Sequence, residues 1–154
     1  MIKNTSFIFA LLLLLSSFTL TAADEPAYVD GKANYYAIDP PLVVNLNAMS
    51  KIIFLQIKVQ LMSRDASAMI AVTKNRAAIV DTLTMLLAEQ TPETMQDVKI
   101  RESVRMEALE RCSKVLEKLA GIRAGKPTGE KDSDGNPIVT RGLEAVLFTD
   151  IVIQ

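Results

Sequence analysis

A long apolar alternation over Lys51 to Asp65, KIIFLQIKVQLMSRD, constrains the fold more than any other stretch of the chain. One side of a period-two ribbon is apolar throughout and holds Ile53, Leu55, Ile57, Val59 and Leu61. The other side is polar in its middle, at Gln56, Lys58 and Gln60. This pattern predicts a half-buried β-strand. Ile52, Phe54 and Met62 make the ends of the second side apolar, so we expect part of that side to be covered too.

The residue types present exclude several kinds of function. The chain of 154 residues is long enough for one domain with a sizeable core. It contains no His, which removes the commonest general base and the commonest metal ligand. Its single cysteine, Cys112, rules out an intrachain disulfide. The net charge of −1 becomes −2 without residues 1–23, whose only charge is Lys3, so no basic surplus favours nucleic acid as a partner.

The N-terminus, residues 1–23, has the form of an export segment. Lys3 precedes an apolar run from Phe7 to Leu15, and small residues at Thr21 and Ala23 follow before Asp24. A positive start, an apolar centre and a small-x-small exit are typical of a cleaved signal peptide. A short membrane anchor is the alternative, although a spanning helix needs about 20 mostly apolar residues. Either reading exports everything from Asp24 onward, and inner-membrane association belongs to the second.

Two segments are expected before the long strand. Residues 24–34 are rich in acids, Pro and Gly at their start, which predicts a flexible tether. Pro40 and Pro41 then impose an extended backbone on a first strand built on Leu42, Val44 and Leu46. Turn residues over 47–50 predict a hairpin with the long strand. The Pro-Pro pair is also a form of docking peptide, but the extended entry explains it without a partner.

A helix should begin after the long strand. Asp65 is a suitable N-cap, because its side chain can accept from free amides of the first turn. The apolar stripe that follows runs through Met69, Val72, Ile79, Leu83 and Leu86, beside a second one of Ile70, Ala77, Val80 and Leu87. We interpret Met69 and Met85 as core filling and not as a binding box. Pro92 ends this helix near Gln90.

The next helix has two candidate starts, Thr91 followed by Pro92, or Asp97. Its apolar stripe holds Val98, Val104, Ala108, Cys112, Val115, Leu116 and Leu119. Glu107 with Arg111 and Glu110 with Lys114 mark its solvated side by favourable i,i+4 pairs. Because no His can activate it, Cys112 is expected to be a small core residue and not a nucleophile.

Gly121 suits the end of that helix, and the chain from Gly121 to Gly142 is then polar, turn-rich and long for a connector. Its DSDGN stretch, 132–136, resembles the start of a calcium loop, but the glycine and terminal acid do not fall at the required positions. Asp134-Gly135 predicts an ordinary turn instead. The paired acids Asp132 and Asp134 could suggest a carboxylate-dependent hydrolase, but nothing in the sequence would raise a pKa or exclude water there.

The terminal stretch LEAVLFTDIVIQ predicts another strand. One side would carry Val146, Phe148 and Val152, and the other Leu147, Ile151 and Ile153, so both sides are expected to be buried in an interior strand. The predicted fold class is α+β, with two long helices on a mostly antiparallel sheet. Its central members would include Lys51 to Ser63 and Ala145 to Ile153.

These pieces together resemble a known family, the flagellar basal body-associated protein FliL family. The resemblance is carried by a tyrosine-containing entry to the DPP-x-VVNL strand, Arg64-Asp65 at the end of the long strand, Asn75-Arg76, Gln90-Thr91, and the terminal VLFTDIVIQ. It covers residues 35–154. The sequence departs from the family at its signal-peptide-like N-terminus and in the expanded loop from Gly121 to Gly142.

The resemblance implies a periplasmic domain similar to the stomatin and prohibitin fold, at or attached to the inner membrane. It implies homo-oligomers that form a ring around the flagellar stator and basal body, in support of torque, motility and chemotaxis. No catalytic, cofactor or metal residue is expected, and no cofactor. Contacts are expected on the tether from Asp24 to Asn34 and on the loop from Gly121 to Gly142. A FliL-like paralogue acting as a periplasmic scaffold or adaptor outside the flagellum is the alternative.

Overall fold

The computed structural model describes residues 27–48, 51–123, 127–131, 137–139 and 142–154. The elements in chain order are β1 (Asn34–Leu46), β2 (Ile53–Ser63), α2 (Ala66–Lys74), α3 (Arg76–Ala88), α4 (Pro92–Gln96), α5 (Val98–Ala120), β3 (Pro127–Lys131), β4 (Pro137–Val139) and β5 (Ala145–Ile153). Within the described ranges, no helix is both long enough and apolar enough to span a bilayer.

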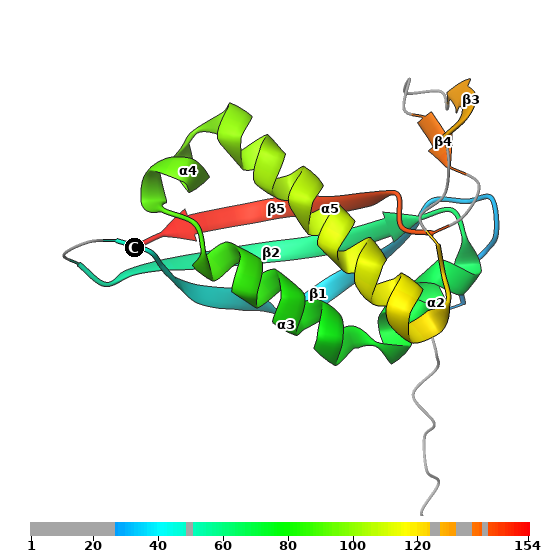
Figure 1. Ribbon diagram of the computed structural model, residues 1–154, viewed down its shortest axis with the longest axis horizontal. Coiled ribbons are helices and arrows are strands. Elements are labelled where there is room, and N and C mark those ends of the chain that lie inside the picture. The colour runs from blue at the N-terminus through cyan, green and yellow to red at the C-terminus, as the bar shows by residue number, and fades with distance from the viewer. Residues whose placement is uncertain (1–26, 49–50, 124–126, 132–136, 140–141) are drawn as a thin grey trace, which may run out of the picture.

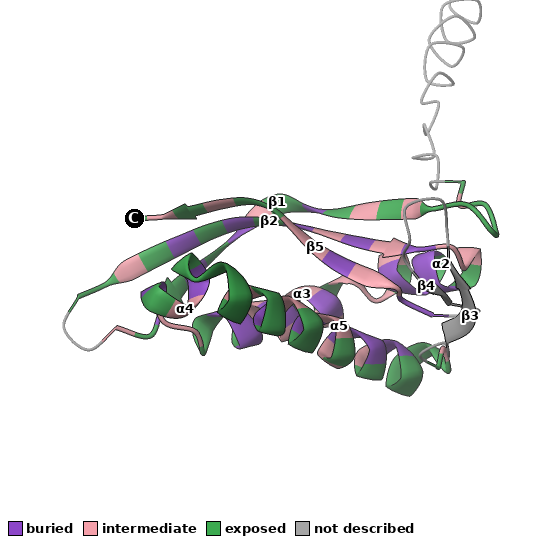
Figure 2. Cartoon of the chain, turned by 90° about the horizontal axis from the view of Figure 1, so that it is seen from above, coloured by how far each residue is buried: buried purple, intermediate pink, exposed green. Residues whose placement is uncertain are grey.

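The described elements form two layers. β1, β2 and β5 make an antiparallel sheet in the order β1-β2-β5, and β3 and β4 pair with each other separately. The two longest helices, α3 and α5, lie on one face of the three-stranded sheet (Figures 1 and 2). The predicted α+β class, with two long helices packed on a mostly antiparallel sheet, is confirmed.

The alternation of β2 places this strand at the centre of the sheet and of the core. Leu55, Ile57 and Leu61 are fully buried, and β2 pairs with β1 on one side and with β5 on the other. The cover expected for the second side of β2 is not found among the described residues, where Phe54 stays 49% exposed. That side of the sheet faces away from the helices (Figure 2).

The predicted first strand is correct in place but longer than expected. β1 begins at Asn34 and is interrupted between Ile38 and Leu42, where its register against β2 shifts. Pro40 and Pro41 occupy this interruption and cannot donate to a strand ladder. At the same interruption, the side chain of Arg76 on α3 donates a hydrogen bond to the carbonyl of Asp39.

The helix predicted after the long strand is divided in two. Asp65 caps α2 as expected, with its carboxylate accepting from the amides of Ser67 at 2.9 Å and Ala68 at 3.2 Å. The helix then breaks at Asn75, whose backbone leaves the helical region with ψ near 23°. Its side chain donates to the carbonyl of Ala71 at 2.8 Å, a local bond of the kind that competes with helix continuation.

Both candidate starts for the second helix are used. Thr91 caps the short α4, and Asp97 caps α5 through the amides of Lys99 and Ile100. Gly121 ends α5 with φ at +68°, the left-handed conformation that favours glycine at this position. The ion pairs Glu107–Arg111 and Glu110–Lys114 are present at 2.7 and 2.6 Å.

Most of the predicted core is buried, but part of the second stripe of the first helix, the two ends of α5 and one methionine are exceptions. In that second stripe Leu87 is buried, whereas Ile70 and Ala77 are exposed. Met69 and Cys112 are fully buried, whereas Met85 is 59% exposed and does not fill the core as expected. Val98 and Leu119, at the two ends of the α5 stripe, are also exposed. The end turns of α5 therefore extend past the region that the sheet covers.

The terminal strand departs most from its prediction. β5 pairs with β2 alone among the described residues, so it is an edge strand and not an interior one. Its register against β2 shifts beside Val59, with Thr149 as the extra residue between Phe148 and Asp150. A bulge of this kind reverses the alternation of sides. Val146 therefore lies opposite Leu61, and Ile151 and Ile153 lie opposite Ile57 and Leu55 on the same, core side.

Candidate functional site

The two segments on which the sequence places partner contacts meet at one corner of the fold. The turn Ser63–Asp65 and the two segments bound to it, residues 27–34 and residues 142–144, are together called the β2–α2 corner. The β3–β4 hairpin and the start of β1 lie at the same end of the molecule as α2 (Figures 1 and 2). The described ends of the expected tether and of the expected loop are thus neighbours in space.

Residues 27–34, which belong to the segment 24–34 expected to be a flexible tether, are bonded to this corner. The amide of Gly31 donates to the carbonyl of Arg64 at 2.8 Å, and Asp30 accepts from the amide of Ala66 at the same distance. Asn34 donates to the carbonyls of Val29 at 2.9 Å and Ser63 at 3.2 Å. The described part of the tether is therefore attached to the fold and not free.

The Tyr28 side chain adds a contact between this segment and α2. Its hydroxyl lies 3.1 Å from the hydroxyl of Thr73, near the end of α2. Residues 27–34 contain only two large apolar side chains, Tyr28 and Val29, and the attachment of this segment relies on polar contacts that composition does not reveal.

The base of the loop from Gly121 to Gly142 is held by the opposite side of the same turn. The hydroxyl of Ser63 donates to the carbonyl of Gly142 at 2.6 Å, and the amide of Gly142 donates to the Asp65 carboxylate at 3.0 Å. Ser63 is fully buried and also accepts from the amide of Asp65 at 2.9 Å. These bonds fix the point at which the loop returns to the sheet.

A nearly enclosed ion pair completes the corner. Arg64 and Glu144 approach to 2.6 Å, with side chains 17% and 4% exposed. The Glu144 carboxylate also accepts from the backbone amide of Arg64 at 2.6 Å. Because both of its oxygens are engaged, the enclosed carboxylate is paired and hydrogen-bonded, as burial of a charge requires.

Asp65 serves two elements at once, and its ionisation reflects this. Partial burial alone would raise the pKa of Asp65. Hydrogen bonds from the Ser67 hydroxyl and from the amides of Gly142, Ala68 and Ser67 together lower the pKa by more than burial raises it, so it lies below its usual value. The charged form is thus favoured in the folded chain. The same carboxylate caps α2 and retains the loop base.

Next to the corner, a groove of about 880 Å³ runs between α5 and residues 143–144. Its floor is partly apolar, with Met106 half exposed and Leu143 buried. Its acids are Glu102, Glu107, Glu110, Glu117 and Glu144. Each of these acids has an ion-pair partner, in turn Arg105, Arg111, Lys114, Arg123 and Arg64. The groove offers a surface for a partner but no isolated charge.

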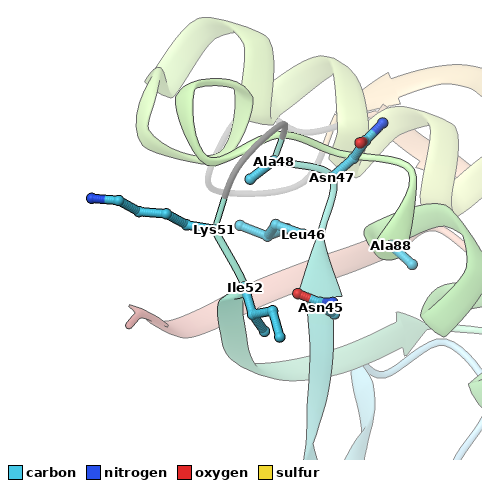
Figure 3. Close-up of a pocket in the computed structure, with 7 residues that line it drawn as sticks. All are labelled: Asn45, Leu46, Asn47, Ala48, Lys51, Ile52 and Ala88. Atoms are coloured by element: carbon cyan, nitrogen blue, oxygen red, sulfur yellow. The ribbon is translucent and has the colours of Figure 1, made fainter.

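A second hollow, of about 580 Å³, lies at the opposite end of the sheet (Figure 3). It is formed where β1 leaves the sheet and α3 ends, around Leu46, Asn47 and Ala88. Among the described residues that line it, Lys51 is the one with an ionisable side chain, which extends away from the hollow in Figure 3. Such a lining offers no acid–base pair.

The residues that could support chemistry are Cys112, possible metal ligands and the acids of the DSDGN stretch. Cys112 is fully buried, and burial raises the pKa of its thiol to about 12, which keeps it in the unreactive thiol form. In the part of the chain that the structure describes, no group of three or more potential metal ligands is found. The DSDGN stretch at 132–136, with Asp132 and Asp134, lies outside the described residues.

The sequence did not reveal the residues that build the corner. Arg64 and Asp65 stood out as the end of the long strand, and Asp65 as a helix cap, but their bonds to Glu144 and Gly142 join positions almost eighty residues apart. No local periodicity carries such a pairing. The unusual placement of two charges directly after a buried strand is the one signal that could have drawn attention to them.

A comparison with protein families matches residues 35–154 to one family, described as flagellar basal body-associated protein FliL. A search of curated proteins finds no match. The matched range begins in β1 and runs to the end of β5, so it includes the sheet, the helices and the loop base of the corner.

Proposed function

Because the chain belongs to the FliL family of flagellar basal body-associated proteins, we propose that it is an accessory protein that associates with stator units and supports motor torque and motility. The observation that carries this proposal is the family match over residues 35–154, which takes in every element of the described fold. The basal-body association follows from the family; the stator and torque roles are the proposed part.

The contact surface that we propose is the β2–α2 corner with the segments that leave it. The tether and the loop both depart from this corner, so one partner could touch both at once. The partly apolar groove beside α5 extends this surface. Homo-oligomerisation into a ring is part of the same proposal.

We place the domain in the periplasm, at or attached to the inner membrane. Residues 1–23 support export, either as a cleaved signal peptide or as a retained anchor. Mass spectrometry of the protein recovered from the membrane and periplasmic fractions tests this. A mature N-terminus at Asp24 is expected; an intact Met1 chain in the inner membrane would establish the anchored form.

We also propose that the protein is not an enzyme. The chain has no His, and its one thiol is buried and un-ionised. The proposed activity is therefore binding, with the helices and sheet as a scaffold.

The decisive experiment is a motility assay on a deletion strain complemented with loop variants. Shortening Lys126 to Pro137 to a tight turn should preserve protein abundance but reduce swimming and stator co-purification. A matched variant keeps the loop length but replaces the same residues by Gly and Ser, which separates loop sequence from loop reach.

The outcomes separate the flagellar role from the alternative. Normal swimming with the shortened loop at normal abundance would exclude the loop as a required contact. Normal swimming after deletion of the whole gene would contradict the flagellar role and favour a periplasmic scaffold or adaptor instead.

A further inference from the structure

The two outer strands of the sheet differ in how their free edges are protected. On β1 the edge is interrupted by Pro40 and Pro41, and Arg76 covers the Asp39 carbonyl. β5 has nine residues, AVLFTDIVI, without proline or lysine. Its edge carries the bulge at Thr149 and a bond from Arg105 to the Val146 carbonyl at 3.0 Å, but no described strand pairs with it. Unpaired backbone groups along such an edge are sites at which another strand adds.

The backbone groups that β5 presents at this edge can be assigned. Phe54 and Gln154 exchange two backbone hydrogen bonds of 2.9 Å, so Gln154 directs its amide and carbonyl toward β2. By the alternation of an antiparallel ladder, Ile153 and Ile151 then direct theirs outward. At the other half of the strand, Arg105 donates to the Val146 carbonyl at 3.0 Å from α5, which marks Val146 as outward too. Phe148, two positions on, follows Val146.

The bulge at Thr149 limits how a further strand can pair with both halves of β5. A regular strand in register with Val146 and Phe148 is out of phase with Ile151 and Ile153, because the extra residue breaks the period of two. A second copy of β5 carries the same extra residue. An antiparallel pair with its two-fold axis between Thr149 and Asp150 therefore restores the phase on both sides.

We propose that two copies of this chain pair through their β5 edges in that register, so that the two sheets become one. Val146 then lies opposite Ile153 of the second copy, and Phe148 opposite Ile151, as hydrogen-bonded pairs with core-side side chains. Leu147 lies opposite Val152 on the open side of the sheet. The bulged residues of the two copies face each other.

The charges of the strand are compatible with this two-fold contact. Asp150 is the only charged residue of β5, and Lys58 of the neighbouring strand neutralises it at 3.1 Å. Two neutral Asp150–Lys58 pairs would meet near the axis, without an unpaired like charge. A two-fold (isologous) contact also pairs the β5 edges of both copies at once, whereas one foreign peptide pairs with the β5 edge of one copy. The inference concerns the purified chain and does not depend on the proposed flagellar role.

Cysteine cross-linking on the full chain tests the register. Leu147→Cys and Val152→Cys are prepared separately, oxidised alone and as an equimolar mixture, and examined for disulfide-linked dimers. The proposed pair brings residue 147 of one copy opposite residue 152 of the other at a non-hydrogen-bonded position, where Cα atoms lie about 4.5 Å apart and a disulfide can form. Native Cys112 is fully buried, so the unmodified chain provides the blank.

We expect the mixture to yield more linked dimer than either variant alone. Equal yields would overturn the register, and no linked dimer in any sample would overturn the contact. Val43→Cys, on the exposed side of the other edge strand, is the matched control and should not cross-link above the blank.

Sedimentation of the full chain in detergent provides a test without cysteines. Val152→Lys should weaken the dimer about tenfold or more, because the lysine is introduced twice in a two-fold pair and opposes Leu147 each time. Val43→Lys makes the same change at an exposed position of β1 and should leave the dimer unchanged. A chain that stays monomeric at all concentrations would overturn the proposal and leave the edge to a strand from another protein.

Discussion

Glu144 shows how strongly one residue depends on a distant part of the chain. Its carboxylate is 4% exposed and faces the Arg64 side chain and backbone, both at 2.6 Å. Removing the charge from one partner of an enclosed pair deprives the other of that compensation. The free energy of unfolding should therefore be more sensitive here than at any surface ion pair.

We expect Glu144→Gln to lower the free energy of unfolding by about 3 kcal/mol, near the low end of the range for a buried pair that loses one charge. Urea unfolding measures this. The control is Lys114→Gln, which removes an ion pair whose side chains are 70% and 66% exposed and should cost no more than about 0.5 kcal/mol. Equal effects of the two substitutions would contradict the enclosed character of the Arg64–Glu144 pair.

Asp65 predicts a pH dependence of stability with a defined sign. Its pKa is lowered in the folded chain below its ordinary value of 3.8, so its charge stabilises the fold above that value. The stabilisation is lost as the pH falls through the folded pKa. Asp65→Asn keeps an oxygen for the cap but removes the charge. We expect it to be less stable by about 1 kcal/mol or more at pH 7, because the charge at the helix start is lost and the amide nitrogen in place of Oδ2 cannot accept from the Gly142 amide. The difference should vanish well below pH 3.8; one that persists in acid would show that geometry and not charge is responsible.

At the scale of elements, the sequence predicts what local chemistry determines. Asp65, Thr91 and Asp97 are recognisable as helix caps and Gly121 as a helix end, because each acts on amides or carbonyls within a few residues. The alternation of apolar and polar residues in β2 likewise predicts which of its side chains are buried. The break at Asn75 escaped because a polar residue between apolar stripes is common inside a helix.

The terminal strand was misplaced for two physical reasons. Its bulge at Thr149 reverses the alternation, so residues assigned to opposite sides, such as Phe148 and Ile151, share the core side. Its position at the edge is decided by pairing with β2, which no property of the strand itself reveals. The polar corner was missed because its partners are distant in sequence.

The edge position changes the expected cost of a core substitution in β5. Phe148 is only half-buried, so Phe148→Ala should cost about 2 kcal/mol, below the 3–5 kcal/mol typical of a fully buried Phe. Ile57 is fully buried in the central strand, so Ile57→Ala should lower the free energy of unfolding by about 3–4 kcal/mol. Chemical denaturation of both variants compares them. A larger loss for Phe148→Ala would return the strand to the interior of the sheet.

At the scale of the whole molecule, the two-layer arrangement predicts an uneven resistance to opening. β2 is hydrogen-bonded on both sides and lies under the helices, whereas β1 and β5 each have one outer edge. Hydrogen exchange should therefore be slowest at β2 amides and faster at the outer amides of the two flanking strands. Outer β5 amides that exchange as slowly as those of β2, even in dilute monomeric protein, would contradict this order.

The β2–α2 corner also determines how the molecule carries a mechanical force. The N-terminal segment is bound at this corner through Gly31 and Asn34, and the loop base is bound there through Gly142, so both attachment points lie within a few residues of Ser63 and Asp65. Tension between a membrane-side attachment and a partner held by the loop would pass through these few hydrogen bonds. For a force that enters through the Gly142 end of the loop, the sheet and helices would lie outside the path and would keep their shape while the corner is under strain.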